Sequence, residues 1–381
     1  MSRLGAILRA HGGAYRDRFS SRMSADQLRA MRELAVCHTP ALGGVRWHCP
    51  HCQERVFTYR SCGNRHCPAC GHADAKLWLA RQQRRLLPGT TYHLLTFTVP
   101  EALRRPIRSH PREILPILFD AASSALVDLC RAPRFLGAMP GLSAALHTWT
   151  RQLLYHPHVH FLATGGGLGP DGAWHQADPK FLVPVRALSR LYSARVRDAL
   201  RQRHPAIFAA IPQSVWRRSW VVHSKPVDDA DHALTYLARY IHRVALADSA
   251  ILRHDDHEIV FRYRDGKTGQ SRTARLEPLE FIRRFLQHVL PTGFRKVRHY
   301  GLHHSSKRKT LRLLQAQLAF VHRLPMPSAA PPTLPPAPPP LCPRCLTPMA
   351  TDGRIAPCFA LPVNATARGP PRPEPSQGLT R

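Results

Sequence analysis

The stretch of residues 49–70, CPHCQERVFTYRSCGNRHCPAC, constrains the fold more than any other part of the sequence. Cys49 and Cys52 form one Cys-x-x-Cys turn, and Cys67 and Cys70 form a second. One such turn places two thiolates correctly for a tetrahedral ion, and two turns complete its four ligands. The spacing is close to that of a zinc ribbon. We therefore expect these four cysteines to bind one structural Zn²⁺.

Further potential metal ligands surround the two turns. They are Cys37, Cys62, His48, His51 and His66. These residues could complete a second site or be spare. Because closed four-ligand sites are structural, we expect this region to fold around metal and to present a basic surface without doing chemistry itself.

The charge of the chain indicates a polyanionic partner. Lys and Arg number 55 against 24 Asp and Glu, for a formal net charge of +31. Each phosphate that a protein neutralises releases a counterion, so nucleic acid is the usual partner for such a charge. The alternative is a GC-rich genome that encodes many arginines. Arg55, Arg60 and Arg65, in the cysteine stretch, fit either a phosphate-contacting surface or a solvated face.

The apolar segments of the sequence bear on cellular location and on membrane association. The N-terminus has no uninterrupted apolar core typical of a signal peptide. The longest apolar segment, ILPILFDAASSALVDLC, contains Asp120 and Asp128 and reads as a core helix. We expect a cytoplasmic protein, in contact with nucleoid DNA, that has no membrane partner. Its ten cysteines then favour metal binding over disulfides.

Composition divides the chain into three regions. Residues 1–85 hold six of the cysteines, and residues 86–322 carry the apolar periodicity of a folded domain. Residues 323–381 begin with a proline-rich run and end in a polar segment, so we expect a disordered tail. That tail also contains Cys342, Cys345 and Cys358.

The middle region mixes strands and helices. We expect strands at 91–100, 159–164, 219–225 and 258–265, and helices at 113–130, 185–202, 231–246 and 277–289. The two kinds of element do not alternate strictly. This order favours an α+β fold with a largely antiparallel sheet covered by helices on one side.

Two short motifs carry candidate chemistry. His158 and His160 are two residues apart on an expected strand, so both imidazoles leave the same face and could form half of a divalent-metal site. Tyr236 and Tyr240 are four residues apart in an expected helix, so both hydroxyls share a face. A tyrosine hydroxyl can attack a phosphodiester when a metal or cations stabilise the developing charge. The alternative for the tyrosines is two aromatic residues in a packed core.

Longer motifs in the same order strengthen this interpretation. They are CHTPALGG, CPHC, SCGNRHCPAC, LHTWTRQLLYHPHVHFLATGGGL, YLARYIHRVAL, FRYRD and EFIRRFLQHVLPTGFRKVRHYGL. With them the chain resembles the two-tyrosine HUH transposases of bacterial rolling-circle insertion sequences, including ISCR-type elements, over most of residues 1–315. HUH stands for His-hydrophobe-His, here His158-Val159-His160.

The resemblance implies an N-terminal zinc-binding, DNA-recognition domain followed by a nuclease domain with a ferredoxin-like antiparallel sheet. His158 and His160 would hold Mg²⁺ or Mn²⁺ with a third polar residue. Tyr236 or Tyr240 would attack single-stranded DNA at the element's end and form a 5′-phosphotyrosine link. The other tyrosine would serve the second strand transfer. The oligomeric state is left open.

The third ligand of the catalytic metal has three candidates. His242 lies within the matched motif, although an ideal helix turns it about 200° from Tyr240. His232 shares the face of Tyr236, and His156 shares the strand face before Pro157. We favour His242 as the third ligand.

Two features depart from the family pattern. Val45 follows Gly43-Gly44 where the family often has histidine, which argues against a second zinc site there. The tail's CPRC motif with unmatched Cys358 looks eroded, so we expect no further metal site in the tail.

Three other functions remain open as alternatives. A catalytically inactive, zinc-dependent DNA-binding regulator would use HPHVH only as a phosphate contact. A histidine-metal hydrolase of small molecules explains neither the charge nor the cysteine turns. A carboxylate-triad transposase is disfavoured because acidic residues are scarce, and Asp228, Asp229 and Asp231 fit helix capping better.

Overall fold

The chain forms two compact units in the computed structural model, which describes residues 2–227, 231, 234–235, 245–266, 268–328, 330, 332–333 and 338–358. The smaller unit comprises residues 36–62 and 338–358 of the described chain, and the larger comprises 2–35 and 63–333. Residues 2–35 and 63–85 therefore belong to the larger unit, although the composition groups them with the cysteine stretch. No helix in the described ranges combines the length and apolar character needed to cross a membrane.

The larger unit is built on an antiparallel sheet with strand order β11-β4-β5-β3-β7, and β6 pairs with the end of β5. The strands are β3 (Tyr92–Thr98), β4 (Met139–Trp149), β5 (Tyr155–Leu168), β6 (Trp174–Gln176), β7 (Val222–Val227) and β11 (Val297–Gly301). The long strands β4 and β5 are neighbours at the centre of this sheet.

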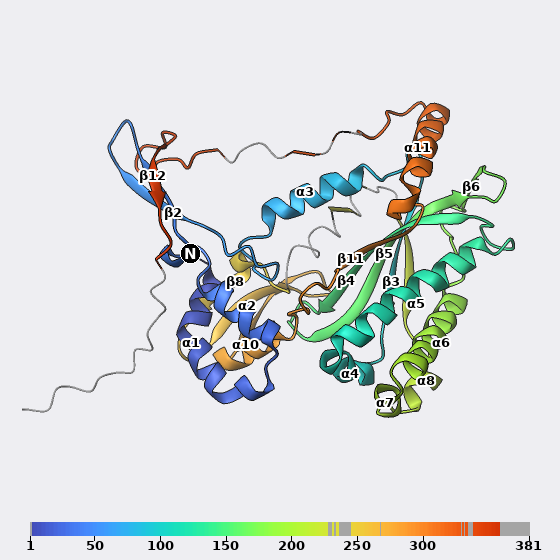
Figure 1. The fold of residues 1–381 in the computed structure, drawn as a ribbon, viewed down its shortest axis with the longest axis horizontal. Coiled ribbons are helices and arrows are strands. Elements are labelled where there is room, and N and C mark those ends of the chain that lie inside the picture. Colours follow the sequence, from blue (N-terminus) through green and yellow to red (C-terminus); the bar gives the residue numbers. More distant parts are fainter. Residues whose placement is uncertain are drawn as a thin grey trace, which may run out of the picture. The chain divides into compact units, whose positions relative to one another are not determined.

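One face of the sheet is apolar and lies under helices (Figure 1). Because side chains alternate between the faces of a strand, Leu146 of β4, Phe161 of β5 and Phe97 of β3 all point to this side and are fully buried. The covering helices are α4 (Arg104–Ser109), α5 (Pro111–Arg131), α6 (Val185–Arg203), α7 (Pro205–Ala209) and α8 (Ser214–Arg217). This packing fixes which face each strand residue occupies.

The remaining elements of the larger unit include a second, smaller sheet of β8 (Ile251–His254), β9 (Ile259–Arg264) and β10 (Ser271–Leu276). Asp248 accepts hydrogen bonds at the N-terminus of α1 from the backbone of Arg3 and Leu4, where a carboxylate satisfies exposed N–H groups. The other helices are α1 (Arg3–Phe19), α2 (Ala25–Ala35), α3 (His72–Gln83), α10 (Pro278–Leu286) and α11 (Arg308–His322). Short 3₁₀ turns are η1 (Ser20–Arg22), η3 (Glu101–Leu103), η4 (Asp248–Ala250) and η5 (Ser305–Lys307).

The smaller unit contains a three-stranded antiparallel sheet in the order β12-β1-β2. Its strands are β1 (Gly44–His48), β2 (Arg55–Tyr59) and β12 (Ala350–Ile355), preceded by the 3₁₀ turn η2 (Pro40–Leu42). A Cβ atom at Gly44 would lie 2.1 Å from the carbonyl oxygen of Thr58, so a glycine is required for the strands to approach.

The α+β class is confirmed, and the expected strands at 91–100, 159–164, 219–225 and 258–265 correspond to β3, β5, β7 and β9. The expected helices at 113–130, 185–202 and 277–289 correspond to α5, α6 and α10. Most of the fourth, 231–246, lies outside the described residues. Two differences matter for the site and the tail. β4 has no expected counterpart, because its run of small apolar residues gave no clear period, and residues 350–355 form β12 instead of a structureless tail.

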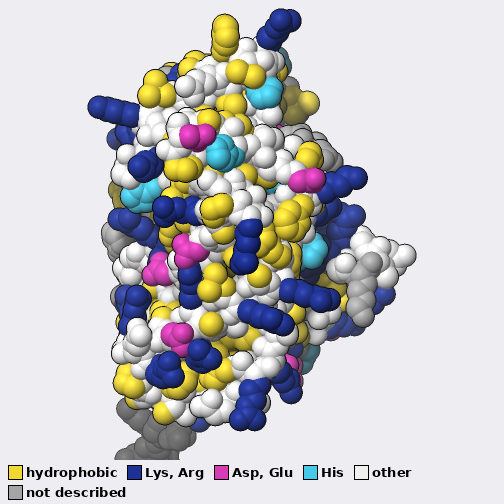
Figure 2. Space-filling view, turned by 90° about the vertical axis from the view of Figure 1, so that its right-hand side faces the viewer, with side chains coloured by type: hydrophobic (Ala, Val, Ile, Leu, Met, Phe, Trp, Pro, Cys, Tyr) yellow, Lys and Arg dark blue, Asp and Glu magenta, His cyan; other side chains and the backbone are white. Residues whose placement is uncertain are grey.

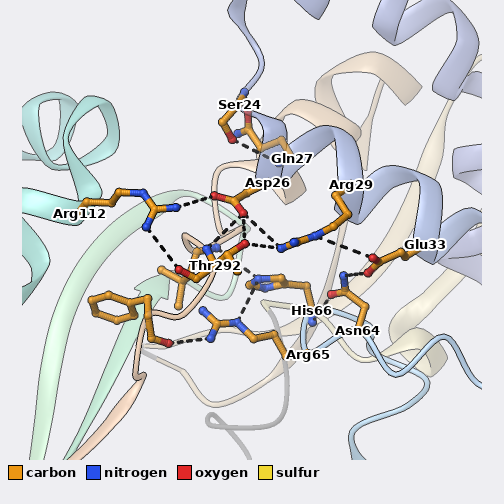
Figure 3. A network of polar contacts seen from close by, with 12 residues as sticks. Ser24, Asp26, Gln27, Arg29, Glu33, Asn64, Arg65, His66, Arg112 and Thr292 are labelled. Atoms are coloured by element: carbon orange, nitrogen blue, oxygen red, sulfur yellow. Dashed lines mark hydrogen bonds and ion pairs between the residues drawn. The ribbon is translucent and has the colours of Figure 1, made fainter.

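A polar network ties α2 to the loop before β11 and to α5 (Figure 3). Ser24 and Gln27 form a reciprocal cap at the start of α2 through two side chain–backbone hydrogen bonds. In the first turn of α2, the Asp26 carboxylate accepts a hydrogen bond from the Thr292 backbone at 3.2 Å and contacts Arg112 at 3.4 Å. Burial acts to raise the pKa of Asp26, but the hydrogen bonds from Thr292 and the nearby guanidinium groups outweigh it and lower that pKa.

Replacing Asp26 with Asn should destabilise the larger unit by about 1–3 kcal/mol at pH 7, since several donors lose a charged acceptor. Because the folded pKa of Asp26 is lowered, its contribution is present above the unfolded pKa of about 3.9 and is lost as pH falls through the folded value. Urea unfolding of both proteins at pH 7 and pH 3 measures this difference. Asp17→Asn, at an exposed carboxylate on α1, is the matched control. Equal stability of wild type and Asp26→Asn at pH 7 would contradict the assigned role.

Candidate metal centre and nucleic-acid surface

The histidine pair of β5 is joined by a third histidine from β4. His147 is paired in register with His158, and one ligand atom each of His147, His158 and His160 lies within 4.8 Å of the others. The ring centroids of His147 and His160 are 4.3 Å apart, and those of His158 and His160 are 4.8 Å apart. Three imidazoles that converge in this way could form one face of a metal coordination shell.

The sheet register places these histidines on the face opposite α5 and α6. Along β5, Val159 and Phe161 lie in the core beneath those helices, so His158 and His160 must point to the other side. His147 alternates in the same way with Leu146 of β4. The apolar face of the sheet thus fixes where the polar ligands emerge.

Hydrogen bonds orient two of the three rings. Nδ1 of His158 donates to the carbonyl oxygen of His156 at 2.7 Å, and Nδ1 of His160 is 2.9 Å from the hydroxyl of Thr96 on β3. Because the carbonyl oxygen can only accept, its bond fixes the His158 tautomer with an unprotonated Nε2. In both rings the engaged Nδ1 leaves Nε2 as the nitrogen that can serve as a ligand. The carbonyl of His156 therefore supports the cluster, while its side chain lies outside the group of three.

Burial keeps all three imidazoles neutral. It lowers the pKa of His158 to about 4 and, with the charge of His158, the pKa of His160 to about 3. Burial likewise lowers the pKa of His147 well below its ordinary value. Since a neutral ring offers its lone pair without losing a proton first, the cluster is ready to bind a cation near neutral pH.

A tryptophan and a lysine flank the histidines. The indole of Trp149 stacks on His147 with ring centroids 5.3 Å apart, and the ammonium of Lys296 lies 4.6 Å from the centre of the indole. Burial, and then the charge of Arg65, lower the pKa of Lys296 to about 7. An aromatic face and a cation beside a metal centre suit a nucleotide base and its phosphate.

Two neighbouring basic pockets lie at the β11 edge of the same sheet. One, of about 820 Å³, is lined in part by Arg85, Arg298, His299 and His303. The second, of about 560 Å³, shares Arg85 and His303 and contains the arginines of α3 and α11. Those further arginines are Arg81, Arg84, Arg308 and Arg312.

Strand β4 has residues at both the first pocket and the histidine cluster. The Ser143 hydroxyl contacts Nδ1 of His299 at 3.1 Å and of His303 at 3.0 Å, and Ser143 lies on the same face of β4 as His147, roughly 13 Å away along the strand. Figure 2 shows a molecular face on which Lys and Arg side chains are widely spread and acidic ones are few.

The tyrosine pair and the favoured third ligand cannot be placed. Tyr236, Tyr240 and His242 lie outside the described residues, as does His232. Leu234, two positions before Tyr236, is described and is buried against Leu162 of β5. Leu162 is on the same strand face as His160, so the chain passes over the histidine face just before the tyrosines.

The cysteine group within the smaller unit differs from the expected set. Cys49 and Cys52 lie there with Cys342 and Cys345, and their four sulfur atoms are within 4.8 Å of one another. This group has the donor set of a structural zinc site. Of the other expected ligands, Cys37 and Cys62 belong to the smaller unit, and Cys67 and Cys70 belong to the larger unit.

His66 is not among the clustered metal-ligand candidates of the described residues. Its Nε2 accepts a hydrogen bond from the backbone of Leu290 at 3.3 Å, and burial lowers its pKa to about 3. His66 is therefore a packing and hydrogen-bonding residue of the larger unit in this structure.

The predicted site residues do not include His147, Thr96, Lys296 or the cysteine pair of the tail. His147 is within the quoted motif LHTWTRQLLYHPHVH. A signal existed: if residues 139–168 are taken as a β-hairpin, His147 comes opposite the HxH motif. Cys342 and Cys345 form a further Cys-x-x-Cys turn, which the unmatched Cys358 led us to discount, whereas the lysine has no comparable local signal.

Comparison with known proteins gives two family matches. Residues 141–310 match the family described as "Putative transposase", and residues 7–99 match the family described as "Transposase zinc-binding domain". The first match includes the three histidines and Lys296, and neither includes the tail cysteines. No solved structure matches the chain significantly.

Two curated proteins are similar over most of their length. The "Putative transposase y4qJ" of Sinorhizobium fredii is 36% identical over 314 residues, which cover 77% of this chain and 78% of that protein. The "Transposase for insertion sequence element IS801" of Pseudomonas savastanoi pv. phaseolicola is 28% identical over 294 residues, covering 72% and 70%.

Replacing His147 with Ala should raise the Kd for Mn²⁺ by at least about 100-fold. Removing a residue that only orients a metal ligand already weakens metal binding by up to about 100-fold, and removing the ligand itself should weaken binding at least as much. His156→Ala is the matched control and should leave the Kd unchanged, since only the backbone carbonyl of His156 supports His158. Titration followed by the electron paramagnetic resonance of free Mn²⁺ measures both constants. Equal affinity of wild type and His147→Ala would remove His147 from the ligand set.

Proposed function

Since the chain belongs to the transposase family of bacterial insertion sequences that includes the IS801 transposase, we propose that it nicks and rejoins single-stranded DNA in rolling-circle transposition. The reaction would proceed through 5′-phosphotyrosine intermediates on Tyr236 and Tyr240. The observation that supports this most is the convergence of His147, His158 and His160 on one sheet face.

The donor set suits a divalent cation. Three neutral nitrogen ligands leave coordination positions for phosphate oxygens, and Mn²⁺ accepts nitrogen donors more readily than Mg²⁺, which prefers oxygen. Such an ion, when bound, would polarise the scissile phosphate. His147 takes the place of His242 in this proposal, because it is the third histidine that shares the face of the HxH pair.

The proposed chemistry on the protein side is a transesterification. The hydroxyl oxygen of Tyr236 or Tyr240 attacks phosphorus and loses its proton to solvent, forming an oxygen–phosphorus bond to the 5′ side. The bond from phosphorus to the 3′ oxygen breaks, and that oxygen takes up a proton to become a free 3′-hydroxyl. The reverse reaction, with a 3′-hydroxyl of another strand end, rejoins the DNA.

The surroundings of the histidines support a single-stranded substrate. Trp149 and Lys296 place an indole ring and an amine beside the histidines, and proteins use such groups to contact unpaired bases and their phosphates. The basic pockets of α3, β11 and α11 then provide phosphate contacts further along the strand.

The double variant Tyr236→Phe, Tyr240→Phe should bind a single-stranded oligonucleotide that carries the element's end but form no covalent adduct, because it lacks both nucleophiles. Denaturing gel electrophoresis of a labelled oligonucleotide with and without Mn²⁺ detects the adduct. Tyr263→Phe on β9 is the matched control and should form it at the wild-type rate. Adduct formation by the double variant would reject the tyrosine assignment, and its absence from wild type with retained binding would favour the inactive regulator.

The double variant Arg81→Ala, Arg308→Ala should weaken binding of single-stranded DNA and flatten its salt dependence. Each lost phosphate contact lowers the slope of log K against log salt by about 0.7, so about 1.4 is expected for both. Fluorescence anisotropy over a series of salt concentrations measures this slope. Arg186→Ala, an exposed arginine on α6, should leave it unchanged. An unchanged slope for the double variant would place the DNA elsewhere.

A further inference from the structure

We propose that Cys49, Cys52, Cys342 and Cys345 bind one structural Zn²⁺, so that the C-terminal CPRC segment supplies half of a zinc site whose other half lies near the N-terminus. Neither family match covers Cys342 and Cys345. The inference is independent of the nuclease chemistry, because all four residues belong to the smaller unit.

The distances between the sulfur atoms fit one ion. Cys49 Sγ lies 3.5 Å from Cys345 Sγ, and Cys52 Sγ lies 3.5 Å from Cys342 Sγ and 3.6 Å from Cys345 Sγ. Four Zn–S bonds of about 2.3 Å in a tetrahedron require sulfur atoms about 3.8 Å apart. Two disulfides would require pairs separated by about 2.05 Å.

The two Cys-x-x-Cys turns have the same backbone hydrogen bonds. Cys49 N–H donates to the carbonyl of Glu54 at 2.8 Å, and Cys342 N–H donates to that of Thr347 at 2.9 Å. In return, the residue after the second cysteine donates to the carbonyl of the first, from Gln53 to Cys49 at 3.0 Å and from Leu346 to Cys342 at 2.9 Å. Two equivalent turns from distant parts of the chain thus present their thiols to one point.

Both turns also have the same unusual backbone conformation. Gln53 has a φ of 61° and Leu346 has a φ of 60°, in the left-handed region that residues other than glycine rarely adopt. In the first turn, Cys52 N–H points to Cys49 Sγ at 3.5 Å, as expected for a donor that stabilises a thiolate. The repeated conformation indicates that both turns meet the same requirement, which is to point their sulfur atoms at a common position.

Besides its sheet, the described part of the smaller unit has a small apolar cluster. Its apolar cluster has four cysteines among seven members, the others being Trp47, Val56 and Met349. The strand after the second turn is anchored beside the first, because β12 pairs with β1 and the Arg46 guanidinium donates to the backbone carbonyl of Asp352 at 2.8 Å. A core this small depends on a bound metal for stability, as in other small zinc-binding folds.

The zinc content of purified full-length protein tests the shared site. Mass spectrometry of metals should find one zinc per chain fewer in Cys342→Ser, Cys345→Ser than in wild type, and the same deficit in Cys49→Ser, Cys52→Ser. The variant with all four substitutions should lose no more than either pair, because the pairs share one ion. Cys358→Ser, at an exposed cysteine, is the matched control and should retain all its zinc.

Three results would overturn the proposal. The first is a zinc content in the Cys342→Ser, Cys345→Ser variant equal to that of wild type. The second is a loss of two zinc ions when all four cysteines are replaced. The third is stoichiometric iron instead of zinc at this site in the wild-type protein.

A measurement on the unmodified protein covers the case in which the variants fail to fold. Cys345 is partly exposed, so burial alone does not protect its thiol from iodoacetamide. Its rate of reaction therefore reports whether the thiolate is bound to a metal. Peptide mapping should find Cys345 protected until a chelator is added, whereas Cys358 reacts at once in both conditions. Reaction of Cys345 as fast as Cys358 before chelation would overturn the site.

Discussion

The antiparallel register between β4 and β5 is the constraint on which the candidate metal centre depends. It sets His147 opposite His158, while Leu146, Val159 and Phe161 fill the core beneath α5 and α6. A shift of one residue in either strand would turn its histidines into that core and its apolar side chains outward. The burial that stabilises the sheet therefore also selects the face on which a cation and DNA can be bound.

Burial at this face has a second consequence, which is electrostatic. It holds the three imidazoles neutral and lowers the pKa of Lys296 to about 7, because each charged form is poorly solvated there. A cation that binds here together with a phosphate would find imidazole ligands that do not have to lose a proton first. The arginines of the neighbouring pockets remain outside this buried region and can attract the rest of the strand.

Each of the two units has polar groups that join segments distant in the chain. In the larger, the Asp26 carboxylate joins α2 to the loop that precedes β11 and so to the strand that follows Lys296 (Figure 3). In the smaller, Cys49 and Cys342 lie together although almost three hundred positions separate them. The apolar cluster of the smaller unit is small, so the proposed metal ion would carry the connection there.

The sequence by itself determined the features whose periodicity is local. Alternation in a strand is enough to put His158 and His160 on one face, and the repeated Cys-x-x-Cys turns are enough to indicate zinc. The α+β class and the helices α5, α6 and α10 followed from the same kind of pattern. Only the tertiary structure decided that His147 stands beside that pair and that Cys49 and Cys52 meet the tail's cysteines. The physical reason is that strand pairing chooses such partners. His147 meets the pair through the register of a hairpin, which neither strand records alone, and the tail's cysteines meet Cys49 and Cys52 through pairing between segments far apart in the chain.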